Sequence, residues 1–158
     1  MADVIGDGMV KVTWVTSLAS TTAPSAATLG AGTDLQSYIT PDGLAIEIGD
    51  DEVDVSALNS TFTSKKVGRG TVSVELTFKN QGAAAAPWTT FASRPTGYLV
   101  VRRNVAAATA WASSQYCEVY IVQAGDQMPI APTANEVAKF TVKLFSTADP
   151  VLHATTGS

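Results

Sequence analysis

Short segments in which apolar and polar residues alternate dominate the chain. The clearest spans residues 71–79, where the apolar face is formed by Val72, Val74, Leu76 and Phe78. A period of two is typical of a half-buried strand in an antiparallel sheet. The same alternation recurs at residues 9–15, 44–48, 98–103, 116–122 and 137–145. We therefore predict a mainly β fold, an antiparallel β-sandwich or barrel with long loops.

One segment favours a helix, and two others favour turns. Residues 83–93 contain Pro87, which suits a first helical turn, so one short flanking α-helix is predicted. Residues 40–43 and 49–51 carry the Pro, Asp and Gly residues that are typical of turns. Residues 44–55 are accordingly predicted to form a hairpin with acidic side chains.

The remaining segments lack periodicity and are predicted to be loops or arms. Residues 17–33 are uncharged, and residues 56–70 end in a basic stretch. Residues 1–8 are expected to be an N-terminal arm, and residues 149–158 an extended or disordered C-terminal arm. No change of composition marks a boundary, so residues 1–158 are predicted to form a single domain.

Composition changes the picture by limiting what the surface can do. Charged residues make up only 15% of the chain, well below the usual quarter. Either the polar faces consist of Ser, Thr, Gly and Asn, or other subunits cover much of the surface. The formal net charge of −4 argues against a protein that grips nucleic acid by its phosphates.

The residues that could carry chemistry are few. His153 is the only histidine and lies on the predicted arm, which is a poor position for a general base. Cys117 is the only cysteine and alternates with Val119, so it is expected in the core. The acidic cluster at residues 50–54 lacks the spacing of a calcium loop. We predict no catalytic residue, no metal and no cofactor, and no enzymatic activity.

The sequence also shows no signal peptide and no apolar run of membrane-spanning length. We therefore expect synthesis in a cytoplasm and no membrane partner. Trp14 and Trp88 fall on predicted inward faces, whereas Trp111 could be either a core residue or part of a sugar-binding platform.

This organisation resembles the major tail tube protein of long non-contractile-tailed, siphovirus-type bacteriophages. The resemblance covers most of the chain. It rests on the N-terminal arm and first strand (2–15), the acidic hairpin (44–55), the long connection (56–70), the helix (87–93) and the closing strand (134–145).

The resemblance implies a structural virion protein with a β-sandwich flanked by a helix. In this family six copies form a ring, and the rings stack into the tube that conducts DNA into the host. The channel of such tubes is typically acidic, so DNA passes without specific binding. The implied partners are further copies of the chain, a tape-measure protein and tail-tip proteins. The implied location is the virion tail.

Two groups of residues follow as candidates for these roles. The channel-lining candidates lie on the polar sides of predicted strands and are Glu47, Glu52, Asp54 and Glu75. The candidates for ion pairs between subunits are Lys65, Lys66 and Arg69. Contacts between rings are expected from residues 17–33, residues 56–70 and both termini.

The alternatives to a tail tube protein are a head decoration protein, a tail terminator, or a carbohydrate-binding β-sandwich module that uses Trp111.

Overall fold

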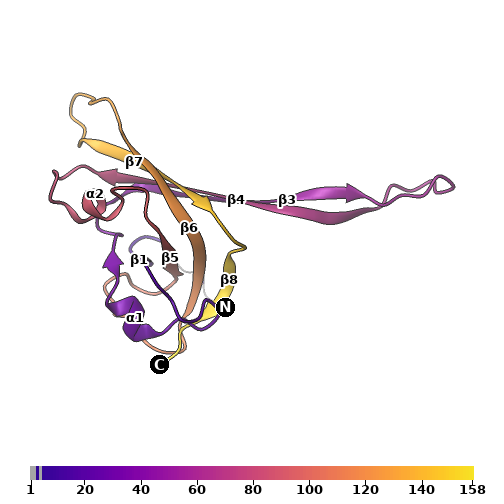
Figure 1. The fold of residues 1–158 in the computed structure, drawn as a ribbon, viewed down its shortest axis with the longest axis horizontal. Coiled ribbons are helices and arrows are strands. Elements are labelled where there is room, and N and C mark those ends of the chain that lie inside the picture. The colour runs from indigo at the N-terminus through magenta and orange to yellow at the C-terminus, as the bar shows by residue number, and fades with distance from the viewer. Residues whose placement is uncertain (1–2, 4) are drawn as a thin grey trace.

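A computed structural model describes residues 3 and 5–158 and shows a mainly β protein with two short helices (Figure 1). The mainly β, antiparallel fold is confirmed. The elements are β1 (Val10–Val15), α1 (Ala26–Gly30), β2 (Thr33–Asp34), β3 (Ile39–Asp54), β4 (Lys65–Lys79), α2 (Ala86–Thr90), β5 (Thr96–Arg103), β6 (Tyr116–Pro129), β7 (Lys139–Ser146) and β8 (Val151–Thr155).

All the strands belong to one antiparallel sheet of order β2-β1-β5-β6-β7-β4-β3, with β8 beside β6. The long strand β6 changes partners along its length. Its first half pairs with β5 and β8, and from Val122 onward it pairs with β7, with a register irregularity between Ala124 and Gln127. The sheet curves along β6, and this curvature encloses the core within a single sheet (Figure 1).

The core contains the apolar faces that the alternation predicted. Val74, Leu76 and Phe78 of β4 are fully buried. The Phe78 ring stacks on Phe91 with 5.6 Å between centroids, and it lies 5.3 Å from the ring of Phe140. Because Phe91 directly follows α2, these contacts fix the predicted helix to the sheet. Trp14 and Trp88 also pack here, as predicted, with Trp14 contacting Phe91 and Trp88 contacting Phe140.

The two predicted turns are wrong because β3 runs through both of them. Residues 40–43 form a bulge within β3, where four residues lie opposite Thr77 alone, and Gly49 pairs directly with Thr71 of β4. The predicted hairpin within residues 44–55 is therefore also wrong, since both of its halves pair with β4. The strand β3 lies at the edge of the sheet, where turn-forming Asp and Gly residues meet no strand on their outer side.

The predicted loops and arms contain more regular structure than expected. Residues 65–70 belong to β4, so the loop is shorter than predicted, and α1 lies within residues 17–33. The C-terminal arm is extended as expected but is not free. Within it, β8 pairs with β6, and the amide of Gly157 donates to the carbonyl of Pro24 at 2.9 Å.

Candidate subunit-interface and channel surfaces

A two-stranded arm, residues 49–71, projects from the body of the protein (Figure 1). The ladder continues to the pair Asp54–Lys65, and Val55 donates its amide to the carbonyl of Ser64 at 3.0 Å. The turn beyond is organised by Ser56, whose amide donates to the Asp54 carboxylate at 2.8 Å. Hydrogen bonds from the side chain and backbone of Ser56 hold the pKa of Asp54 below its ordinary value. The arm is thus an ordered element rather than a flexible loop.

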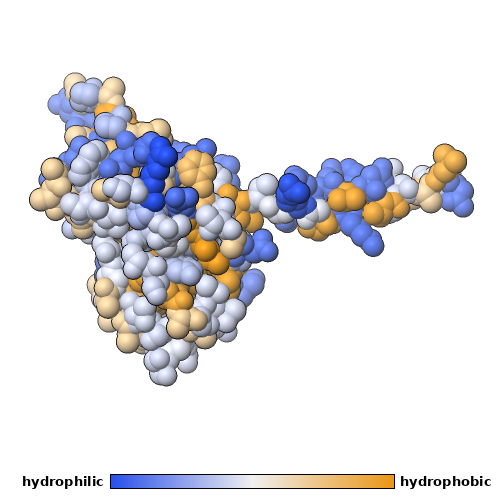
Figure 2. Space-filling view, viewed as in Figure 1, coloured by the Kyte–Doolittle hydropathy of each residue, from blue (hydrophilic) through white to orange (hydrophobic). Residues whose placement is uncertain are grey.

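The arm exposes apolar side chains that no other described residue of the chain covers. Leu58 is 107% exposed and Phe62 is 75% exposed, and both lie in the turn at the tip. Figure 2 shows orange apolar atoms along the arm and at its end. A two-stranded ribbon has no core of its own, and a contiguous exposed apolar patch typically marks an interaction surface. The arm therefore has the surface of an element that becomes covered on assembly.

Two of the four acidic candidates share one exposed face of the sheet. Glu47 pairs with Ser73, and Ala45 pairs with Glu75, so both glutamates point away from the buried side of β4. Glu75 also lies directly opposite Lys143 of β7. The face is therefore polar and mixed in charge, because Lys79 and Lys139, which pair with each other, lie on the same side as Glu75 and Lys143.

The other two acidic candidates, Glu52 and Asp54, lie on the arm at even positions of β3, on the side opposite Glu47. A bulge lies beside them, between the pairs Asp50–Gly70 and Glu52–Val67. Its extra residue is on β4, so successive side chains of β3 still point to alternate faces. Glu52 forms an ion pair with Lys65, with 2.8 Å between Glu52 Oε2 and Lys65 Nζ. The structure thus does not bring the four acids onto one face.

The basic candidates also divide into two kinds. Lys65 already has its partner in Glu52 of the same chain. Lys66 and Arg69 are exposed, and within residues 3 and 5–158 neither forms an ion pair. Those two charges are available to another molecule.

Among the described strands, β3 and the second part of β6 each have an edge without a strand partner, as do the shorter strands β2 and β8. The alternation pattern did not reveal these edges. The strand β3 pairs only with β4 among the described strands. Beyond Ala124, β6 pairs with β7 on one side, while its pairing with β5 ends at Gln123. Unpaired edges present rows of amide and carbonyl groups that can pair with another chain. The unpaired edges of β3 and β6 belong to the part of the sheet formed by β6, β7, β4 and β3.

The candidate chemistry of the other residues is explained by packing. Trp111 is 9% exposed, and its indole donates to Thr13 Oγ1 at 3.1 Å, so it is a core residue rather than a sugar platform. Cys117 is buried, as predicted, and burial together with the charge of Glu118 raises its pKa to about 11.

Among the described residues, no group of His, Cys, Asp and Glu could hold a metal ion. No described helix has the length and apolar character needed to span a membrane.

The exposed arm, the unpaired edges and the polar sheet face together define a structural protein that acts through assembly. The sequence model of the family described as phage tail tube protein matches residues 1–157. The chain belongs to the phage tail tube protein family, and it is a non-enzymatic structural component of a phage tail. The resemblance to tail tube proteins is thereby confirmed, whereas the siphovirus type stays a prediction.

The fold is also similar to that of a solved structure. A chain from the cryo-EM structure of the anti-feeding prophage (AFP) baseplate, 6-fold symmetrised, superimposes with a TM-score of 0.62 at 11% identity. The superposition covers 98% of both chains, so the whole fold is shared. No curated protein matches the sequence.

Proposed function

We propose that six copies of this chain form a ring, and that stacked rings form the tube of a siphovirus-type tail that conducts DNA into the host. The observation that carries the proposal is the pair of unpaired strand edges on β3 and β6. Edge-to-edge pairing of copies related by rotation would continue the sheet from subunit to subunit until the ring closes. Six-fold symmetry is supported by the assembly that contains the structurally similar chain.

In this ring, the exposed face with Glu47 and Glu75 lines the channel. The opposite face of the same strands is committed to the core, which leaves only this face for the lumen. Ser73 and Thr77 lie between the charges, and Glu75 faces Lys143. Glu47 and Glu75 repel phosphates along the part of the face that they occupy, so DNA passes them without specific contacts.

The arm makes the contacts between rings. Its tip is exposed and apolar, and it carries Lys66 and Arg69, whose charges are available for ion pairs with another subunit. Glu52 and Asp54 then belong to the arm rather than to the channel wall. The C-terminal arm is a weaker candidate because it is bonded to its own body. The chain is made in the host cytoplasm, and its further partners are the tape-measure protein and the tail-tip proteins.

Negative-stain electron microscopy of the purified, concentrated protein tests this function. We expect hollow tubes with regular cross-striations and six-fold end views. Particles that remain trimers, or single rings that never stack at any concentration, would contradict the proposal. Those two results would instead match a head decoration protein and a tail terminator, respectively.

A further inference from the structure

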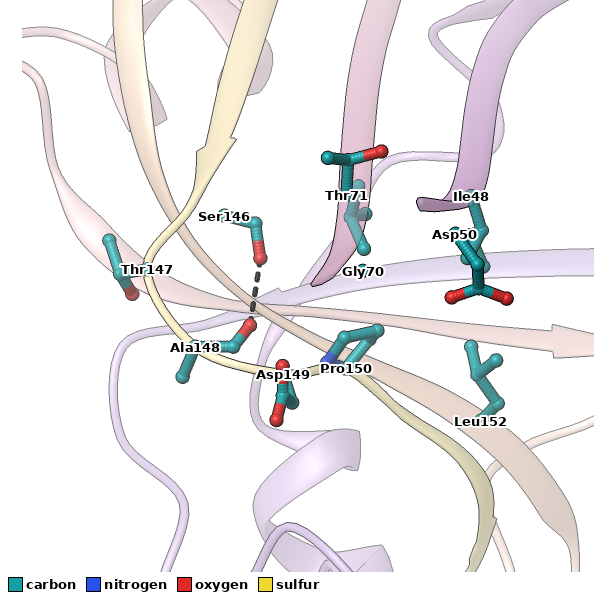
Figure 3. Close-up of a pocket in the computed structure, with 11 residues that line it drawn as sticks. Ile48, Asp50, Gly70, Thr71, Ser146, Thr147, Ala148, Asp149, Pro150 and Leu152 are labelled. Carbon is teal, nitrogen blue, oxygen red and sulfur yellow. Dashed lines mark hydrogen bonds between the residues drawn. The ribbon is translucent and has the colours of Figure 1, made fainter. Parts of the chain in front are cut away.

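A groove of about 620 Å³ lies where the arm leaves the body (Figure 3). One wall is the base of the arm, with Ile48, Asp50 and Val72. The other wall is the connection between β7 and β8, followed by Leu152. Figure 3 shows the two walls facing each other across the groove.

The second wall is held in place before any partner arrives. Ser146 donates its hydroxyl to the carbonyl of Ala148 at 2.8 Å, and the amide of Thr147 donates to the carbonyl of Ile121 at 2.9 Å. Pro150 restricts the backbone at the start of β8. The groove is therefore a preformed recess, which lowers the ordering cost of an incoming segment.

The groove contains both apolar surface and unbalanced negative charge. Ile48 is 47% exposed and Leu152 is 37% exposed. Asp50 and Asp149 supply carboxylates, and the lining includes no lysine or arginine. An occupant that fits this surface needs apolar side chains next to a cation.

The tip of the arm has this composition. The turn carries Leu58 and Phe62, and residues 55–64 are uncharged. Lys66 follows shortly after, where it pairs opposite Val53 and has no ion-pair partner among the described residues. Within one subunit the tip cannot reach the groove, because the paired strands of the arm lead directly away from it (Figure 1).

We propose that the arm tip of a second copy of the chain fills this groove. Leu58 and Phe62 lie against Ile48, Val72 and Leu152, and Lys66 approaches Asp149. The inference rests on the proposed stacking of rings and deepens it by naming the acceptor of the arm.

The geometry of this contact makes it repeat. The donor site is the tip of the arm and the acceptor site is its base, so every copy that gives a tip can also receive one. Such a head-to-tail contact extends as a stack when it relates copies in successive rings, because the axial shift between them keeps it from closing. At about 3.3 Å per residue, the arm from Gly49 to Leu58 separates the two sites by roughly 30 Å. That separation is then expected to contribute to the axial repeat of the tube.

Disulfide trapping tests the contact. Two differently tagged variants, Phe62→Cys and Leu152→Cys, are mixed, assembled and exposed to a mild oxidant. We expect a crosslinked dimer carrying both tags, formed in tubes and not in dilute monomer. Phe62→Cys mixed with Val137→Cys is the matched control, because Val137 is 59% exposed on the connection between β6 and β7. The native Cys117 does not interfere because it is buried.

Charge reversal supplies a second, independent test. Asp149→Lys and Lys66→Glu should each lower tube yield, and the combination of both changes in one chain should restore it. Asp42→Lys, which changes an exposed carboxylate outside the groove, should leave tube yield unchanged.

The outcomes separate this inference from the proposed function. Tubes that form normally while Phe62→Cys crosslinks to Val137→Cys, or to neither partner, would overturn the groove assignment and leave the tube intact. Single charge reversals that have no effect on tube yield would overturn it as well. If the unmodified protein never forms tubes, the proposed function itself fails.

Discussion

Arg102 organises the largest ordered loop of the body, and removing its side chain should destabilise the whole fold. The residue is fully buried in β5. Its guanidinium donates to the backbone carbonyls of Ala106, Thr109 and Ala110 and to Gln115 Oε1, at 2.7–3.2 Å. It also lies 5.0 Å from the centre of the Trp111 ring. These contacts hold the connection between β5 and β6 against the core.

The size of the effect follows from these contacts. A hydrogen bond of this kind contributes about 1 kcal/mol net, and a desolvated cation–π contact about 1 kcal/mol more. Arg102→Ala would remove all of them and leave buried carbonyl groups unpaired, for a loss of about 5 kcal/mol in the free energy of unfolding. At about 2–4 °C per kcal/mol, the Tm should fall by roughly 10–20 °C.

Urea denaturation followed by circular dichroism measures this loss on the unassembled protein. Arg103→Ala is the matched control, because the neighbouring Arg103 forms an exposed ion pair with Glu118. Such a pair is worth about 0.2–1 kcal/mol, so the control should lose no more than that. Equal losses for the two variants would refute the reasoning that Arg102 holds the loop through its buried contacts.

Three further predictions concern the channel, the packing and the thiol. Glu47→Lys combined with Glu75→Lys should leave folding and tube formation unchanged but slow DNA ejection from complemented phage, and normal ejection would remove these residues from the channel. Gly97→Ala should cost about 1–3 kcal/mol of unfolding free energy, because the new Cβ would lie 2.7 Å from the Trp14 ring, whereas Gly30→Ala meets nothing within 4 Å and should be tolerated. Burial and the charge of Glu118 raise the pKa of the Cys117 thiol to about 11, so Cys117 should resist iodoacetamide at pH 8 in the folded protein and react on unfolding. Rapid labelling of the folded protein would contradict this.

The local pattern predicted the core strands well because their alternation reflects the burial of one face. Val74, Leu76 and Phe78 are placed correctly because side chains of β1, β5 and β6, and Phe91 after α2, pack in one core with them. The helix α2 was predicted from Pro87 and its apolar neighbours, and it forms over a shorter range. The helix α1 was missed because its single turn has no amphipathic repeat.

The hairpin arm and the buried Arg102 could not be predicted in the same way. Residues 49–51 have turn chemistry, yet they lie in a strand because pairing with β4 along the whole edge outweighs the local preference. Arg102 lies in an alternating strand where a charge suggests exposure, and only the loop that follows buries it. The unpaired edges are properties of the sheet order, which no local pattern encodes.

The most direct test of the tail-tube account is a cryo-EM reconstruction of tubes assembled from the purified chain. The account predicts six subunits per ring, β3 of each subunit paired with β6 of its neighbour, and Glu47 and Glu75 facing the channel. A tube whose channel is lined by another surface, with the Glu47 and Glu75 face on its outside, would contradict it.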